Sequence, residues 1–471
     1  MLLGIFFVKG RTPPLGVWYN ALRHISPLFS IFRETFSKFS LISVFAFSAG
    51  VSLGLFFVGK TIGAFTRKSN FLVLVLFIPL LVYVSFPMFN GQIVAGYTYG
   101  PIKQMTVNVP YYWEELYRYT SEHKPAGRTL TLPKNGYYNK SYIWKQGYSG
   151  NPFEFYFNGN TLSYIDTDPK TLGDYVVNEL YESIEQYNAS ADESYMRSTR
   201  NLLRLLGVSN LLQMNDYDWR ASTDYANWSV SNMAGFYDTL SEKRIVTVKK
   251  DFGFLTRNYL LSIPHIKGGS NIYRFDGDPS TQDYLNDLTG KPGVSLYTVK
   301  EDIALAKIYS PDLIVPISDD QDFYAKLKQF DYTNQRPLFI QNNIADTRVV
   351  VVDPPKVEFS QESPTRFKVV LSGNIQTNFY LVLNETYDAG WTLLDAPGGS
   401  ELLEHHFVGN MFANVWEIRN GSLGENTTIY IEHESGKRLA ITSAISIVAF
   451  GIIVLLLVGG YVKKYISTKV S

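Results

Sequence analysis

Residues 439–462 have the sequence LAITSAISIVAFGIIVLLLVGGYV, which is 24 residues without a charged side chain. An α-helix needs roughly 20 predominantly apolar residues to cross the hydrocarbon core of a bilayer. Two earlier stretches share this character: residues 41–58 are uncharged over 18 positions and residues 71–89 over 19 positions. The sequence therefore predicts three transmembrane helices, with a buried core helix as the alternative for each. Residues 1–8 are apolar but too short to cross, and resemble the tail of a span whose beginning is missing.

The long segment between the second and third predicted spans, residues 90–438, is expected to fold in water. Hydrophobic residues are 45% of the chain and aromatic residues 15%, which suffices for large cores and argues against disorder. Cysteine is absent, which excludes a disulfide framework, a thiolate metal site and a cysteine nucleophile. The segment holds 32 Lys and Arg against 42 Asp and Glu, and this acidic balance argues against a nucleic-acid partner.

Basic residues in the short loops predict the orientation of the chain. The loop 59–70 carries Lys60, Arg67 and Lys68, and the tail 463–471 carries three lysines. Placing both in the cytoplasm gives a multi-pass cell-membrane protein with residues 90–438 outside. This orientation also places the basic residues 9–40 outside, which conflicts with the preference of basic loops for the cytoplasm, but the reverse orientation would place two basic segments outside.

Six N-x-S/T sequons lie in the predicted exported region and none elsewhere. Such sequons suit an exterior surface, although a chain rich in Asn contains several by chance. The candidate glycosylation sites are Asn139, Asn188, Asn227, Asn384, Asn420 and Asn426.

The first part of the exported region, residues 90–345, is expected to be a mixed α/β domain. Apolar residues at helical spacing predict helices over residues 111–123 and 195–206. Gly207 ends the second helix, a strand follows over residues 208–214, and Asn215 and Asp216 form its turn. Further short strands are predicted over residues 313–317 and 337–340.

From about residue 346 the pattern changes to short β-branched or alternating runs separated by Gly, Asn and Pro. This pattern is typical of a β-sandwich. Because its last strand leads almost directly into residues 439–462, the module 346–438 is expected to be membrane-proximal. The predicted strands span residues 348–352, 366–371, 379–383, 415–418 and 428–432.

A series of short motifs, kept in order from about residue 9 to residue 435, resembles one family. The first group is Lys9-Gly10, residues 13–16, 25–29 and 32–34, and Lys38-Phe39. The second group is Arg128, Leu132-Pro133, Tyr142, Trp144, residues 206–208 and Asn215-Asp216. The third group is Asn384-Glu385, Tyr387, Gly390-Trp391, Gly409, Asn414 and Trp416. Together they resemble the large membrane glycosyltransferases of the alpha-(1->3)-arabinofuranosyltransferase type, which have a GT-C fold.

The resemblance implies a role in cell-surface glycan synthesis at the outer membrane face. The implied partners are a polyprenyl-phosphate-linked sugar, membrane lipid and a glycan acceptor. Enzymes of this fold have many spans and a catalytic acid in the first external loop, whereas this chain has three predicted spans and no acid before Glu34. It therefore resembles the C-terminal, non-autonomous part, which would need an N-terminal multi-span partner. The alternative is a non-catalytic, membrane-anchored surface protein that binds glycans or partner proteins.

An aromatic-rich segment just before the first predicted span, residues 29–39, contains Arg33, Glu34 and Lys38. Arg binds phosphate bidentately and Lys binds it as a point charge, so these residues are a candidate lipid-phosphate site. The alternative is ordinary anchoring at the interface by cations and aromatic rings. Glu34 is also a candidate general base.

Trp391, Trp416 and Tyr387 are a candidate carbohydrate-binding platform, because amphipathic aromatic faces stack on sugar rings. The alternative for the tryptophans is the sandwich core. His405 and His406 are adjacent, and neighbouring side chains on a strand point to opposite faces, so no metal site is predicted there.

Residues 54–61 fit the phosphate-loop pattern G-x-x-x-x-G-K-[ST]. A true phosphate loop lies between a strand and a helix, whereas these residues end an apolar stretch, so a span end is favoured over a nucleotide site. No nucleophile-elbow or zinc-protease motif is present, and no cofactor is predicted.

Overall fold

The computed structural model describes residues 109–436, apart from short gaps, together with isolated positions at 54, 57, 60, 448 and 451. The gaps are 126, 135–140, 145–147, 150–151, 166–168, 170, 218–224, 263–280, 301–302, 342–349, 374–376, 403 and 420–426. The chain divides into two compact units, Met1–Tyr99 and Gly100–Ser471, and the architecture below is that of the second unit.

The predicted spans over residues 41–58, 71–89 and 439–462 lie outside the described residues, apart from a few isolated positions. Within the part of the chain that is described, no helix has both the length and the apolar character that a membrane crossing requires.

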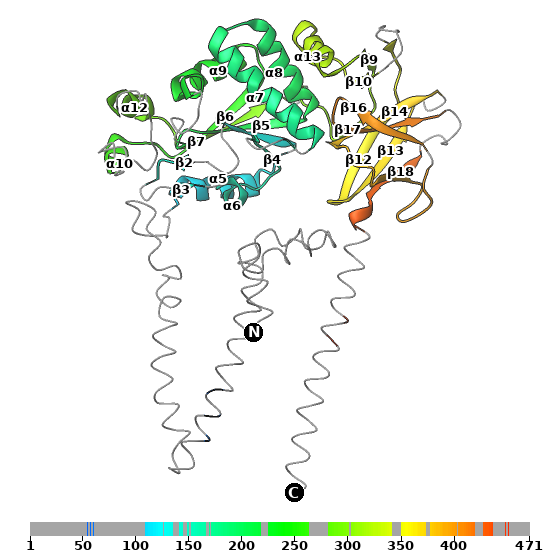
Figure 1. The fold of residues 1–471 in the computed structure, drawn as a ribbon, viewed down its shortest axis with the longest axis horizontal. Helices are drawn as coiled ribbons and strands as arrows, with labels where there is room; N and C mark the ends of the chain where they lie inside the picture. Colours follow the sequence, from blue (N-terminus) through cyan, green and yellow to red (C-terminus); the bar gives the residue numbers. More distant parts are fainter. Residues whose placement is uncertain are drawn as a thin grey trace, which may run out of the picture. The chain divides into compact units, whose positions relative to one another are not determined.

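A five-stranded mixed sheet is the centre of the first domain (Figure 1). Its second and third strands, β1 and β5, are parallel, and β1 also pairs in parallel with β4 at one edge. On the other side β7 runs antiparallel to both β5 and β6. In order across the sheet the strands are β4 (Thr161–Leu162), β1 (Arg128–Leu132), β5 (Val208–Met214), β7 (Val294–Val299) and β6 (Val246–Phe252).

Helices cover both faces of this sheet, because its side chains alternate between two apolar cores. Leu211 packs in one core with α7, α8 and α9, and Leu212 packs in the other with α5. Figure 1 shows the three helices on one side of the sheet and α5 on the other. The helices on the first face are α7 (Leu172–Ser190), α8 (Glu193–Leu205) and α9 (Val230–Glu242). Those of the second core are α5 (Tyr111–Glu122), α6 (Phe153–Tyr156), α10 (Arg257–Ser262) and α12 (Thr281–Leu288).

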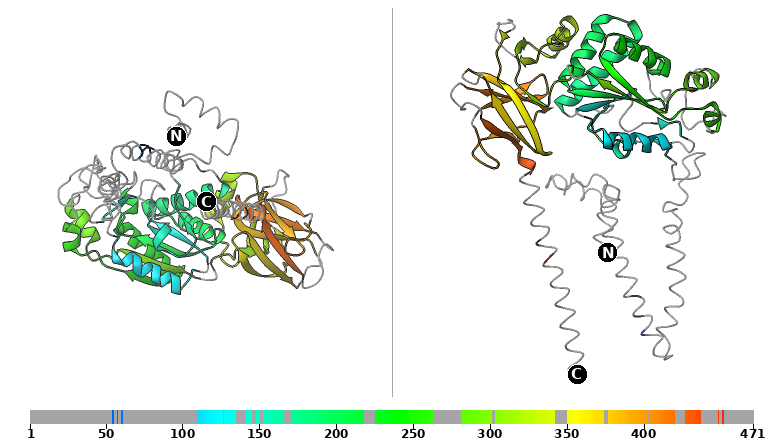
Figure 2. Two further views of the ribbon diagram at one scale, coloured as in Figure 1. Left: turned by 90° about the horizontal axis from the view of Figure 1, so that it is seen from below. Right: turned by 180° about the vertical axis from the view of Figure 1, so that it is seen from behind.

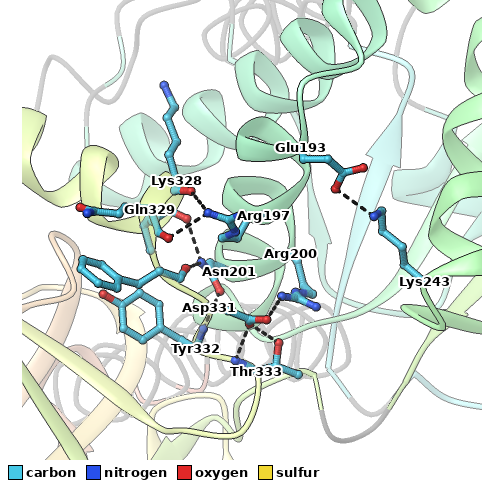
Figure 3. A network of polar contacts seen from close by, with 12 residues as sticks. Glu193, Arg197, Arg200, Asn201, Lys243, Lys328, Gln329, Asp331, Tyr332 and Thr333 are labelled. Atoms are coloured by element: carbon cyan, nitrogen blue, oxygen red, sulfur yellow. Dashed lines mark hydrogen bonds and ion pairs between the residues drawn. The ribbon is translucent and has the colours of Figure 1, made fainter.

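The helix α13 (Asp320–Gln329), which follows the first strand of a small three-stranded sheet, contacts polar side chains of α8 (Figure 3). Arg197 of α8 donates from Nη1 to the carbonyl oxygens of Lys328 and Gln329, each at 2.8 Å. One turn later Asn201 donates to Leu327 O at 2.9 Å, so α8 satisfies the open carbonyls at the end of α13. The strands of this sheet are β10 (Pro337–Gln341), β9 (Leu313–Ile317) and β11 (Val350–Val351).

The second domain is a β-sandwich of two four-stranded sheets (Figure 2). Burial alternates strictly along β13, which places Phe367, Val369 and Leu371 in a core shared with residues of the facing sheet such as Leu381 and Ile418. One sheet is β12 (Lys356–Ser363), β13 (Arg366–Ser372), β18 (Thr428–His433) and β15 (Trp391–Leu394). The other is β16 (His405–Gly409), β17 (Ala413–Ile418), β14 (Phe379–Thr386) and β8 (Ile308–Tyr309).

The structure confirms a mixed α/β region followed by a β-sandwich, and departs from the sequence prediction where the two meet. The predicted helix over residues 111–123 ends one residue earlier, and the predicted strand over residues 208–214 coincides with β5. However, β8 comes from before residue 346 and pairs with β14 of the sandwich, whereas β11, from after it, pairs with β9. The boundary near residue 346 is therefore not clean. The strand β8 forms an edge of a sandwich sheet, and β11 forms an edge of the small sheet that contains β9.

Candidate functional site

Arg128, the first residue of β1, connects the two domains. Its Nη1 donates to Leu206 O at 2.8 Å, which is at the end of α8 in the α/β domain. Its Nη2 donates to Asn384 O and to Glu385 Oε2, the latter at 3.0 Å, and both of these belong to the sandwich strand β14. One guanidinium group therefore holds three chain segments together through the fork of donors that Arg alone provides.

Asn384 strengthens the same junction from the sandwich side. Its side chain is 2% exposed, and its Nδ2 donates to Leu205 O at 2.7 Å. Gly207 lies beside it with a φ of +61°, and an added Cβ there would be 3.1 Å from Leu305 O and 3.3 Å from Asn384 Nδ2. Glycine is needed at position 207 both for its left-handed backbone and for this close approach.

Glu385 is held between two cations. Its Oε2 pairs with Arg128, and its Oε1 is 2.6 Å from Nζ of Lys307, just before β8. The Lys307 ammonium also lies 4.9 Å from the ring centroid of Phe367. Burial raises the pKa of Glu385, but the charges and hydrogen bonds of Arg128 and Lys307 outweigh it, so that the pKa lies below its ordinary value. Glu385 is consequently a carboxylate at neutral pH.

The N-terminus of α7 lies against this bridge. Thr171 and Asp174 form a capping box, in which the Thr171 side chain accepts from Asp174 N and the Asp174 carboxylate accepts from Thr171 N. Gly173 in the first turn is so close to β14 that a Cβ would be 2.5 Å from Thr386 Oγ1. The small side chain at position 173 thus allows the helix to reach the junction.

These elements line a half-open cavity of about 380 Å³ between the α/β domain and the sandwich. It falls within the roughly 300–1,000 Å³ range of small-molecule pockets, towards the small end. The two cations Arg128 and Lys307 and the two anions Asp174 and Glu385 line it, so its formal charge is balanced. Neutral polar and apolar side chains complete the lining, among them Asn160, Thr161, Gln361, Thr386, Val177 and Phe412.

This chemistry favours binding over bond cleavage. The lining offers donors, acceptors and apolar surface for an oriented ligand. Both oxygens of Glu385 already pair with cations, which stabilises its charged form and makes it a weak proton acceptor. Among the described residues no group of three or more His, Cys, Asp or Glu side chains is arranged to hold a metal ion.

Two other residues of the family resemblance, Trp144 and Asp216, meet away from the cavity, on the side of the five-stranded sheet that α5 covers. The carboxylate of Asp216 is fully buried, and its Oδ2 accepts from Tyr112 Oη, Trp113 Nε1 and Trp144 Nε1 at 2.9, 2.9 and 2.7 Å. Burial raises the pKa of Asp216 to about 6, against the opposing effect of these three hydrogen bonds. This cluster, the Asp216 cage, binds α5 and the segment around Trp144 to the end of β5.

The candidate carbohydrate platform is largely interior. Trp391 is 9% exposed and Trp416 is 2% exposed, and both belong to the sandwich core. The ring of His406 stacks on Trp416 with centroids 4.6 Å apart and planes 7° from parallel, so a histidine occupies the face that a sugar would use. Tyr387 is half-buried and lies 5.0 Å from the same His406 ring. The tryptophans therefore pack as the core alternative describes, and Tyr387 alone keeps a partly open ring.

The paired histidines point to different neighbours, as strand geometry predicts. His405 lies 3.8 Å from Glu417, whereas His406 lies 3.2 Å from Asn414 Oδ1. Burial lowers the pKa of His406, although its bond to Asn414 opposes this. A neutral ring stacked on Trp416 is the result.

The sequons differ in accessibility. Asn384 uses its side-chain amide inside the domain junction, so the folded domain does not present it. Asn188 and Asn227 are half-buried neighbours, because Asn188 Nδ2 donates to Asn227 O at 2.9 Å. Asn139, Asn420 and Asn426 lie outside the described residues.

The interfacial candidates Arg33, Glu34 and Lys38 also lie outside the described residues. In the phosphate-loop pattern the described positions Gly54, Phe57 and Lys60 are helical. A phosphate loop needs non-helical backbone at the positions before its lysine, so the helical Gly54 and Phe57 do not fit one, and the span end stays a prediction.

Sequence reasoning marked Arg128, Asn384 and Glu385 through the family resemblance but missed Lys307 and the start of α7. A single lysine between short strands carries no signal of its own. The start of α7 did carry one, because Thr171 and Asp174 have the spacing of a capping box.

No protein-family model matches this chain, and no curated protein matches it. Solved structures that match include the cryo-EM structure of arabinofuranosyltransferase AftD from mycobacteria, with a TM-score of 0.33, 13% sequence identity, and coverage of 78% of this chain and 32% of that chain. A structure of its R1389S mutant matches with a TM-score of 0.30, 13% identity, and coverage of 78% and 33%. The chain thus spans about a third of the length of these proteins. Because superposition at this level assigns no family, the function proposed below rests on the residues of the site.

Proposed function

We propose that this chain is a non-autonomous part of a GT-C-type membrane glycosyltransferase system in cell-envelope glycan synthesis. Its two described domains would hold a substrate, either a lipid-linked sugar or a glycan acceptor, at the outer membrane face. Bond formation would belong to a multi-span catalytic partner.

The junction cavity carries this proposal. The residues that line or build it include Arg128, Leu206, Asn384 and Glu385, which are among the positions of the family resemblance. Its largely polar surface suits a ligand rich in hydroxyl groups, because such a ligand donates and accepts at many points. The charged groups are fixed by one another, which gives a pre-formed site for binding.

A reconstituted transfer assay tests the proposal. The full-length chain, purified in detergent, is mixed with a polyprenyl-phosphate-linked sugar and an oligosaccharide acceptor, with or without membranes of the source organism from which this chain has been deleted. We expect no transfer from the purified chain alone and restored transfer when chain and membranes are combined. Robust transfer by the chain alone would contradict the non-autonomous role.

The alternative, a surface protein that only binds glycans or partner proteins, predicts a different result. Membranes lacking the chain would then transfer sugar as fast as complete membranes. An Arg128→Met variant in the same assay separates a role of the junction from a general effect of adding protein, with the exposed Arg118→Met of α5 as its control.

A further inference from the structure

We infer that the junction cavity binds an uncharged saccharide and rejects free or lipid-linked phosphate. This inference rests on the proposed function and deepens it, because it selects the glycan over the phosphate-bearing lipid as the group that enters the cavity. It follows from the ion pairs that the charged residues of the lining already form with one another.

Both cations of the cavity are already paired with Glu385. Arg128 already donates to Leu206 O, Asn384 O and Glu385 through Nη1 and Nη2. Lys307 lies 2.6 Å from the other oxygen of Glu385. The carboxylate of Glu385 therefore neutralises much of the positive charge that would attract a phosphate group, and the phosphate would lie beside a carboxylate with which it shares the sign of its charge.

The helix end gives no compensating positive charge. An anion at the N-terminus of α7 would be favoured by the helix dipole and by free backbone N–H groups. Here the Asp174 carboxylate occupies the first turn and the Thr171 hydroxyl accepts from Asp174 N. The capping box thus places a negative group where a phosphate would bind.

A sugar hydroxyl fits the same surroundings without displacing a partner. It donates to a carboxylate oxygen of Glu385 and accepts from Lys307, so that both ions keep their pairing. Asn160, Thr161 and Gln361 add neutral donors and acceptors around the ring. Apolar side chains such as Val177 and Phe412 face the C–H surface of the sugar.

The tip of the β12–β13 hairpin forms the sandwich side of the cavity mouth. Gln361 is exposed, lines the cavity, and lies next to a register shift between Gln361 and Ser363. Such bulges redirect side chains at the ends of strands. A larger side chain at position 361 would therefore narrow the cavity, and Gln361 takes no part in the ion pairs of the junction.

The test measures binding to the full-length chain in detergent by isothermal titration. The probes are uncharged pentofuranose and hexopyranose oligosaccharides, inorganic phosphate, and a polyprenyl phosphate in matched micelles. We expect saturable binding of at least one oligosaccharide and no comparable binding of either phosphate probe.

Glu385→Gln gives the most specific readout, because the two ligand classes should respond in opposite directions. Loss of a charged hydrogen-bond acceptor should weaken oligosaccharide binding about tenfold, whereas removal of a negative charge should strengthen phosphate binding. Glu362→Gln, on the exposed part of β12, is the matched control and should change neither.

Gln361→Trp supplies a variant that leaves the junction intact. A bulky ring at the mouth should reduce oligosaccharide binding at least tenfold, and Ser360→Trp, exposed on the same strand, should leave it unchanged. If a phosphate probe binds and the oligosaccharides do not, this inference fails and the proposed function survives with the lipid-linked donor as ligand. If no probe binds, or if Gln361→Trp binds normally, the cavity is not the recognition site and both proposals fail.

Discussion

Asp216 in its cage and Glu385 at the domain junction are two carboxylates in opposite surroundings. Asp216 is fully buried and receives three hydrogen bonds from neutral donors on one oxygen. Glu385 is partly exposed at the edge of a cavity and receives one cation on each oxygen. Burial dominates at Asp216 and raises its pKa to about 6, whereas the two cations dominate at Glu385 and lower its pKa.

The difference separates a residue that holds the fold from one that also faces a ligand. The Asp216 cage satisfies aromatic N–H and O–H groups in a buried core. The Glu385 bridge joins two domains around a space of ligand size. Both belong to the family resemblance, so a motif position by itself does not distinguish the two roles.

Asp216→Ala should have the largest effect on stability. It leaves the buried donors of Tyr112, Trp113 and Trp144 without their acceptor, and each unsatisfied donor costs roughly 1–3 kcal/mol. We expect the free energy of unfolding to fall by about 4 kcal/mol. Chemical denaturation followed by tryptophan fluorescence measures this loss, and a loss below about 1 kcal/mol would show that the cage is not a main support of the fold.

The stability of the native protein should also depend on pH through Asp216. Because its folded pKa of about 6 lies above the ordinary value of 3.8, its contribution is fully present below pH 3.8 and is lost as the pH rises through 6. This contribution is about 3 kcal/mol. Asp216→Asn lacks it, so the difference in unfolding free energy between wild type and variant should fall by most of that amount between pH 4 and pH 7. A pH-independent difference would contradict the assigned environment.

Glu385 should give the opposite profile. Its folded pKa is depressed, so its contribution to stability is present above its ordinary value of 4.5 and is lost as the pH falls through the folded pKa. The difference between wild type and Glu385→Gln should therefore shrink on acidification. The same denaturation series measures both carboxylates. If the two differences in unfolding free energy changed in the same direction with pH, the two carboxylates would not lie in opposite environments.

Arg128→Met should have a smaller effect than loss of the cage, because its side chain is 15% exposed and water can reach part of the junction. Three hydrogen bonds disappear, and Glu385 keeps only Lys307. We expect a loss of about 2 kcal/mol in unfolding free energy. Arg128→Lys should recover part of it through its charge but not through the fork geometry. Recovery of full stability by lysine would show that charge alone holds the domains.

Two glycine substitutions should give the smallest effects, with opposite signs. Gly207→Ala places a Cβ at φ +61° against Leu305 O and should cost about 1 kcal/mol. Gly235 lies within α9 with open space around it, so Gly235→Ala should stabilise by about 0.5–1 kcal/mol. Denaturation midpoints of the two variants measure these changes. Equal shifts in both variants would show that the close packing at the junction does not set the cost of replacing Gly207.

Elements with a strong local pattern were predictable from the sequence. The helix over residues 111–123 exposes one face and buries Trp113 and Leu116, which gives the 3.6-residue period. Gly207 marked the end of α8, and the alternation of β13 marked a half-buried strand. By contrast, β1 was not predicted, although its sequence RTLTL alternates between polar and apolar residues; the burial of Thr129 and Thr131 on the second face appears only in the structure.

The amino-acid sequence by itself determined the order of the two architectures and the two groups of motif residues, because periodicity and turn residues are local properties of the chain. Only the tertiary structure decided which of those residues meet. Arg128 and Glu385 are 257 positions apart, and Trp144 and Asp216 are 72 apart. No local pattern encodes such contacts, since they arise when sheets and helices bury their apolar faces and bring distant polar groups to the same place. The cavity exists for the same reason, because it is lined by residues of β1, α7 and β14 that packing brings together from distant parts of the chain.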